Sequence, residues 1–343
     1  MPLAQIQENV SIFYQDSGAP PNATTYTTIV VVHGLIVNGA TFARLLPQAS
    51  AHGLRIITMN NRDYAGSTPY TDTELAELIS PDTEVQASAV RRWGGEVAAF
   101  VHFVCTTLQV PAATSGSGGV VLYAESLSSI AALAILGDPR TTSPELRAVL
   151  APYLRKVVLY EPPGFVFGAR PAGGLTFPVA DAAVPVDAKA AAFLGWCSAH
   201  YAAVSALGDQ TPEALKARDA APLPTPSSFK GLSQNELAQL VDPGVVGRSA
   251  LVIATAPEIR TTHTRRALFD ADAVLPGVEV LVLWSERSPW ITVWGAQVVQ
   301  GFMSEEAESG KTKRRLELGK VDNANHFIHW EEPERLVQVL VNL

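Results

Sequence analysis

Short apolar runs rich in β-branched residues recur along this chain, and stretches with helical spacing separate them. The clearest runs are TTIVVVHG (27–34), LRIITMN (54–60), VVLYAE (120–125), RKVVLYE (155–161) and VEVLVLW (278–284). Runs of this kind, without polar alternation, are typical of strands that are buried on both faces. Because strands that alternate with helices pair in parallel, the pattern predicts an α/β fold with a mostly parallel, doubly wound sheet.

The remaining segments extend this predicted sheet. The early stretch QENVSIFYQDSG suits an antiparallel hairpin at its edge, and RRLELG (314–319) is typical of its last strand. The longest helical stretch covers residues 81–110 and contains Gly94 and Gly95, where we expect an irregularity. A final helix is expected to begin at Pro333.

Between residues 162 and 275 the alternation of strands and helices stops. This stretch holds Ala-rich helical segments such as DAKAAAFLGWCSAHYAAVSALGD. We therefore predict a core domain formed by residues 1–161 and 276–343. Residues 162–275 are predicted to form a helical lid that is inserted between two strands of the sheet.

Composition narrows the possible partners. The chain has 343 residues, a formal net charge of -8, 47% hydrophobic and 17% charged residues, and two cysteines, Cys105 and Cys197. The negative charge argues against nucleic acid and anionic membranes as partners. No apolar run reaches the roughly 18 residues of a membrane span, and the first residues do not resemble a secretory leader. We therefore expect a soluble cytoplasmic protein, and its oligomeric state stays open.

Sheets of this kind carry their chemistry in the loops after the strands. In chain order these loops read HGLIVNG, NNRDYAGST, AESLS, YEPPG, WSERSPW and NANHFIHWEEPERL. The HG pair, the RDYAGS turn, the serine between strand and helix, and NHFIHWEEP follow one another in an order that resembles lid-bearing enzymes of the α/β-hydrolase fold. The resemblance covers nearly the whole chain and implies a hydrolase with a serine, a histidine and an acid in these loops.

Ser126 lies where the resemblance implies a nucleophile, at the turn between a strand and a helix. The usual motif at this turn is G-x-S-x-G, and here Ala124 and Ser128 replace both glycines. Small neighbours are needed because the strand and the helix approach closely, and alanine and serine are the next smallest residues. The alternative is that Ser126 only caps the helix, a position that serine favours.

The resemblance also implies an oxyanion hole and a general base. The backbone N–H groups of Leu35 and Leu127 are the expected oxyanion hole, and His33 is expected to orient that loop. His326, between the last strand and the final helix, is the expected base. Four other histidines are expected to have core or surface roles: His102, His200, His263 and His329. Of these, His200 and His263 lie in the insertion and stay candidates for substrate contact.

The acid departs from the pattern. The resemblance implies an aspartate after VEVLVLW, where this chain has Ser288, which cannot hold a charge against an imidazolium. Glu161, in YEPPG after the preceding strand, is the expected replacement. Similar fungal lactonases that act on a resorcylic macrolactone use a glutamate after the same strand. Glu286, Asp322 and the absence of any acid stay as alternatives.

A serine nucleophile favours acyl transfer to water, because epoxide hydrolases and haloalkane dehalogenases of this fold need an aspartate. Carbon–carbon bond hydrolysis and a non-hydrolytic, small-molecule-binding role stay open. The insertion supplies aromatic residues, of which Phe193, Trp196 and Tyr201 are predicted to contact substrate. We expect the substrate to be a neutral, apolar carboxylic ester or lactone of secondary, polyketide-like metabolism. No Walker loop, dinucleotide motif or cysteine–histidine cluster is present, so neither a cofactor nor a metal is expected.

Overall fold

The described part of the chain builds an eight-stranded sheet with the order β1-β2-β4-β3-β5-β6-β7-β8. The computed structural model describes residues 2–114, 116–208, 210–270, 274–307 and 314–343. The strands are β1 (Leu3–Gln7), β2 (Val10–Asp16), β3 (Thr27–Val32), β4 (Leu54–Met59), β5 (Val120–Glu125), β6 (Leu154–Tyr160), β7 (Glu279–Ser285) and β8 (Leu316–Val321). β2 runs antiparallel to β1 and β4, and the other neighbours are parallel. The predicted α/β sheet is confirmed.

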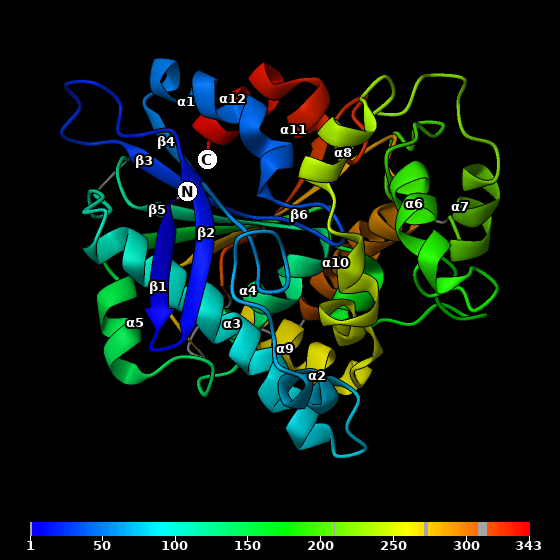
Figure 1. Ribbon diagram of the computed structural model, residues 1–343, viewed down its shortest axis with the longest axis horizontal. Coiled ribbons are helices and arrows are strands. Elements are labelled where there is room, and N and C mark those ends of the chain that lie inside the picture. Colours follow the sequence, from blue (N-terminus) through cyan, green and yellow to red (C-terminus); the bar gives the residue numbers. More distant parts are fainter. Residues whose placement is uncertain (1, 115, 209, 271–273, 308–313) are drawn as a thin grey trace.

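Helices cover both faces of the sheet (Figure 1). One layer contains α1 (Leu46–Ala49), α11 (Ile328–Glu331) and α12 (Pro333–Val341). The other contains α3 (Thr83–Thr106), α4 (Ser129–Gly137), α5 (Pro144–Leu150) and α9 (Pro257–Phe269). Two further helices are α2 (Asp72–Leu78), which packs on α3, and α10 (Trp290–Ala307), which follows β7.

The central strands contribute side chains to both layers. In β3, Ile29 and Val31 belong to one hydrophobic cluster, whereas Val30 and Val32 belong to the other. Successive residues of a strand point to opposite faces, and here both faces are covered by helices. This double burial is the reason that the run TTIVVV shows no polar alternation.

The helix α3 passes through Gly94 and Gly95 without interruption, so the expected irregularity is wrong. The glycines serve close packing instead. A Cβ on Gly94 would lie 2.8 Å from Thr141 Cγ2 and 3.1 Å from Ala131 O of α4. A pair of glycines in a helical pattern therefore marks a close contact between helices here, not a break.

Gly137→Ala is expected to destabilise the protein. Gly137 ends α4, and an added Cβ would overlap the carbonyl oxygen of His263 on α9, so the two helices would have to separate. We expect a loss of roughly 1–3 kcal/mol of unfolding free energy, measured by urea denaturation. Gly301→Ala is the matched control: on α10 the added Cβ meets nothing within 4 Å, and it should stabilise by about 0.5–1 kcal/mol. Equal effects of the two substitutions would contradict this packing.

The residues described between β6 and β7 form helices and loops and add no strand to the sheet. The α-helices are α6 (Val186–Cys197), α7 (Pro212–Asp219), α8 (Gln234–Leu240) and α9. α6 and α7 lie beyond one end of the sheet, whereas α9 packs against α4 in the helical layer (Figure 1). Within the described ranges, no helix is long and apolar enough to cross a membrane.

Candidate active site

Ser126 lies at a sharp bend between β5 and α4. Its φ of 53° falls in the left-handed region, which residues with a side chain seldom adopt. The space is small, because a Cβ on Gly34 would lie 3.1 Å from Ser126 Cβ. Ser128 is buried, and its hydroxyl donates a hydrogen bond to His33 O at the end of β3. These contacts hold a strained backbone at the bend although both glycines of the usual motif are missing.

A histidine and a glutamate from two other loops meet near this bend. His326 follows β8, and its Nδ1 lies 3.1 Å from Glu161 Oε2. Glu161 directly follows β6, has a φ of 54°, and accepts hydrogen bonds from Ser285 N and, at 2.9 Å, from Thr292 Oγ1. Both His326 and Glu161 are buried. A carboxylate on Nδ1 holds the proton there and leaves Nε2 for exchange with a reacting group.

The rival acids point elsewhere. Glu286 forms an ion pair with Lys320 at 2.7 Å and accepts a hydrogen bond from Asn323 N at 2.8 Å. Asp322 is exposed and pairs with the same lysine at 2.8 Å. Ser288 is buried, and its hydroxyl has no hydrogen-bond partner among the described residues. The structure thus brings Glu161 to His326, and it brings neither Glu286 nor Asp322 there.

The second ring nitrogen of His326 faces another carboxylate. Its Nε2 lies 3.5 Å from Oε1 of Glu125, the residue before Ser126. A nucleophile and its general base are expected to lie within hydrogen-bond reach, so the sequence predicts a bond between Ser126 Oγ and Nε2. Within the part of the chain that the structure describes, that bond is not formed, and the prediction is wrong for this structure. Catalytic hydrogen bonds are often long in unliganded enzymes and tighten when substrate binds.

The charges around His326 favour its protonated form. Burial lowers the pKa of His326, but Cys197, Glu161 and Glu125 raise it, and the resulting pKa lies well above the ordinary value. Burial also raises the pKa of the Cys197 thiol, which is therefore neutral at pH 7. A carboxyl group lies on each side of the imidazole ring, Glu161 at Nδ1 and Glu125 at Nε2.

The loop after β3 lies against the bend. His33 is buried, and burial lowers its pKa to about 4, so that the ring is neutral. Its Nε2 accepts a hydrogen bond from Asn61 N at 3.0 Å, and its Nδ1 donates to Gly34 O at 2.9 Å. His33 therefore holds this loop in place. The backbone N–H of Leu35 donates to no other group in the described ranges and stays available to an external oxygen.

A small cavity, here called the aromatic cavity, is lined by Ser126 and His326. Part of its wall comes from the insertion: Phe165, Phe177, Phe193, Trp196 and Cys197. Two of the predicted substrate contacts, Phe193 and Trp196, thus lie in this wall. Tyr201 lies outside it and donates a hydrogen bond to Trp196 O at 2.7 Å.

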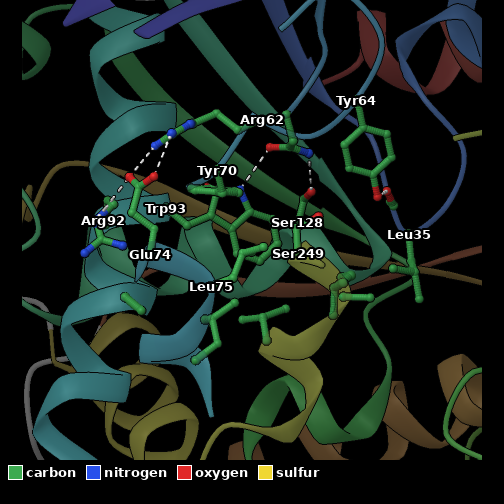
Figure 2. Close-up of a pocket in the computed structure, with 17 residues that line it drawn as sticks. Leu35, Arg62, Tyr64, Tyr70, Glu74, Leu75, Arg92, Trp93, Ser128 and Ser249 are labelled. Carbon is green, nitrogen blue, oxygen red and sulfur yellow. Dashed lines mark hydrogen bonds and ion pairs between the residues drawn. The ribbon is translucent and has the colours of Figure 1, made fainter. Parts of the chain in front are cut away.

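A larger cavity adjoins the aromatic cavity at Leu35 and Leu127, which line both. Figure 2 shows its lining, which draws on the loops after β3 and β4, on α2 and α3, and on the segment around Ser249. Most of the wall is apolar: Leu75, Leu78, Ala89, Trp93, Ala250 and Val252. Neither Ser126 nor His326 lines this larger cavity.

The main polar groups in the wall of the larger cavity bind one another (Figure 2). Arg62 pairs with Glu74 at 2.7 Å. Asn61 accepts a hydrogen bond from Trp93 Nε1 at 2.9 Å and donates to Ser128 Oγ at 3.3 Å. Because these groups already have partners, the cavity suits an apolar group better than a charged one.

The sequence matches no protein-family model, and no curated protein matches it. Solved structures do resemble the chain. A variant of potato epoxide hydrolase has a TM-score of 0.57 and 14% identity, covering 97% of this chain and 95% of that one. The thioesterase domain from the curacin biosynthetic pathway has a TM-score of 0.53 and 12% identity, covering 100% and 98%. An N-acyl homoserine lactone degrading enzyme has a TM-score of 0.50 and 15% identity, covering 100% of both chains. The chain has the α/β-hydrolase fold.

The α/β-hydrolase fold predicted from the strand-end loops is thus confirmed. The roles of Ser126, His326, Glu161, Leu35 and Leu127 stay predictions, because likeness at this identity concerns the fold. Among the other histidines, His200 and His263 lie beside acidic side chains at 3.0 Å and 3.6 Å and line neither cavity. In the described ranges, no group of three or more His, Cys, Asp or Glu side chains is arranged to hold a metal ion.

Three further residues lie beside Ser126, Glu161 and His326 and were not predicted from the sequence: Glu125, Thr292 and Cys197. Glu125 had a detectable signal, since a charged residue ends an otherwise apolar buried strand directly before Ser126. Thr292 supports Glu161 from α10, and Cys197 reaches His326 from α6. Neither of these two has a sequence signal, because both depend on how a distant helix packs against the strand ends.

Proposed function

We propose that this protein is a serine hydrolase that cleaves a neutral, apolar carboxylic ester or lactone through an acyl-serine. Ser126 is the nucleophile, His326 the general base and Glu161 the acid of the triad. The observation that carries the proposal is the buried contact of 3.1 Å between His326 Nδ1 and Glu161 Oε2 at the cavity that Ser126 lines. A carboxylate placed there orients the imidazole and stabilises it when it becomes positive.

The proposed reaction uses these groups in order. Ser126 Oγ attacks the carbonyl carbon while His326 Nε2 takes its proton. The negative oxygen that forms is bound by the N–H groups of Leu35 and Leu127. When the bond to the alcohol breaks, the alcohol takes the proton from His326. Water then attacks the acyl-serine with the same histidine as base, which releases the acid and restores Ser126.

We assign the lid role to the insertion, residues 162–275, chiefly to the part before α9. The support is the wall of the aromatic cavity, to which Phe177 and Trp196 belong, with ring centroids 6.1 Å apart. Because α9 packs against α4, it serves the helical layer of the core. A covered, apolar site excludes bulk water and strengthens the electrostatic effects on the reacting groups.

The two cavities support a substrate with two apolar arms. The alcohol must take its proton from His326, which lines the aromatic cavity and not the larger one, so the alcohol arm leaves on that side. The acyl arm stays on Ser126 and extends past Leu35 and Leu127 into the larger cavity. Aromatic side chains around the alcohol arm favour an aryl or bulky apolar alcohol. An open-chain ester fits this division better than a small lactone.

Ala89→Leu is expected to shorten the acyl chains that the protein accepts. Ala89 lies on α3 in the wall of the larger cavity, so a leucine removes space from the acyl arm. The kcat/KM for p-nitrophenyl octanoate relative to the acetate should fall by roughly 10-fold. Ala99→Leu is the matched control, because Ala99 lies on the same helix but at a separate surface pocket. An unchanged ratio in Ala89→Leu would show that the acyl arm does not enter this cavity.

A fluorophosphonate probe tests the proposal directly, because it reacts covalently with an activated serine whatever the true substrate is. We expect stoichiometric labelling, with mass spectrometry locating the adduct on Ser126 and no adduct in Ser126→Ala. The absent hydrogen bond between Ser126 and His326 favours one competing function, a non-hydrolytic protein that binds small molecules. Folded protein that takes no label would support that function and overturn the hydrolase.

A further inference from the structure

Glu125 is a buried carboxylate that has no role in the proposed Ser126–His326–Glu161 triad. It ends β5 directly before Ser126 and has 0% exposed surface. Its Oε2 accepts a hydrogen bond from Gly34 N at 2.8 Å, and Gly34 leads into the loop that carries Leu35. Its Oε1 has no hydrogen-bond partner among the described residues and lies 3.5 Å from His326 Nε2. One side chain thus contacts both the expected oxyanion loop and the expected base.

Glu125 lies near the same nitrogen of His326 that Ser126 needs as its proton acceptor. His326 has two ring nitrogens, and Nδ1 is hydrogen-bonded to Glu161. Nε2 is the atom that must take the proton of Ser126, yet the carboxylate nearest to it belongs to Glu125. A carboxylate favours a protonated Nε2, and a protonated Nε2 cannot accept a proton from serine.

We propose that Glu125 is a positioning residue that anchors the Gly34–Leu35 loop and competes with Ser126 for Nε2 of His326. This rests on the proposed function. In the resting protein the imidazolium lies between Glu161 and Glu125. The pair formed by Glu125 and His326 must release one proton to solvent before Nε2 can act as the base. Glu125 thereby sets the pH above which Ser126 is activated, while its bond to Gly34 keeps the oxyanion loop in place.

Glu125 and His326 are the groups of the site whose protonation changes around neutral pH. Burial raises the pKa of Glu125 to about 7, against the opposing effects of His326 and of the Gly34 N–H. The titratable groups that face the pair are Glu161, Cys197, His329, Tyr64, Tyr123 and Tyr160. Burial keeps the three phenols and the thiol protonated and His329 neutral. Around neutral pH the pair therefore still holds the proton that blocks the base.

Glu125→Gln is the decisive variant, because the amide oxygen still accepts the Gly34 N–H while the negative charge is lost. Removing a negative charge beside an imidazolium favours the neutral ring, so the pKa of His326 should fall. The acid limb of the kcat/KM profile, and that of fluorophosphonate labelling, should move to lower pH by about one unit or more. Glu125→Asp keeps the charge and should leave the limb close to its wild-type position. Glu286→Gln, which alters the ion pair with Lys320, is the control and should leave it unmoved.

The imidazole of His326 can also be titrated by NMR, which needs no turnover. In the wild type its pKa should lie above the ordinary value of about 6.5, and it should drop in Glu125→Gln. A wild-type pKa at or below that value would overturn the proposal, as would an acid limb that stays in place in Glu125→Gln. Labelled protein with an unmoved limb refutes the competition and keeps the hydrolase. Unlabelled protein with a shifted His326 pKa refutes the hydrolase and keeps the Glu125–His326 pair.

Discussion

Ser126→Ala is expected to lower kcat for an ester substrate by roughly 10⁶-fold, the effect seen when a triad serine is removed. The substitution deletes Oγ, the protein atom that forms a covalent bond to the substrate in the proposed mechanism. The cavities and the N–H groups of Leu35 and Leu127 remain. Turnover of a p-nitrophenyl ester measures it, with binding of the unreacted ester followed separately. Substrate affinity should change little, because Ser126 contributes to chemistry more than to binding.

Ser129→Ala is the control for this result. Ser129 is the first residue of α4, and its hydroxyl bonds to Ala124 O at 3.3 Å outside both cavities. It should retain turnover within a few-fold of the wild type. Equal losses in the two variants would mean that the bend is disturbed generally. Full turnover in Ser126→Ala would exclude the acyl-serine.

Glu161→Gln is expected to lower kcat by roughly 10³- to 10⁴-fold, as for triad acids elsewhere. The amide keeps the shape of the side chain but has no charge to stabilise the imidazolium, and its NH₂ group can favour the wrong tautomer of His326. Turnover of the same ester measures the loss. Thermal unfolding checks the fold, since Glu161 also accepts hydrogen bonds from Ser285 N and Thr292 Oγ1.

Glu286→Gln is the matched variant on the neighbouring strand end. Glu286 pairs with Lys320 and does not contact His326, so most of the turnover should remain. Collapse of turnover in Glu286→Gln with near-normal turnover in Glu161→Gln would reverse the assignment of the acid. If neither substitution matters, His326 acts without an acid.

Much of the fold was predictable because its signals are local. The strand runs at 27–34, 54–60 and 120–125 agree with β3, β4 and β5 to within about two residues at each end. Burial on both faces leaves an unbroken apolar run, which few other structures produce. The prediction for Gly94 and Gly95 is wrong because their role does not depend on a local signal. Whether a glycine breaks a helix or admits a neighbour depends on α4, which the local pattern does not contain.

The candidate site divides in the same way. The order of the strand-end loops placed Ser126, Glu161 and His326 at one edge of the sheet, because parallel strands end on the same side. The choice between Glu161 and Glu286 needed the structure. Glu161 has a left-handed backbone and is held by β7 and α10 toward His326, whereas Lys320 draws Glu286 away. Spacing along the chain does not encode either direction.

The α/β class, the order of the strand-end loops along the chain and the residue types available for acyl transfer can all be predicted from the sequence. These follow from periodicity and from the rule that parallel strands share one end. In contrast, the contact of Glu125 with Nε2 of His326 and the meeting of two cavities at Leu35 and Leu127 are seen only in the tertiary structure. Those features arise where elements distant in sequence pack together. Distances of a few ångströms between such elements depend on all the intervening packing, and no local pattern of residues records them.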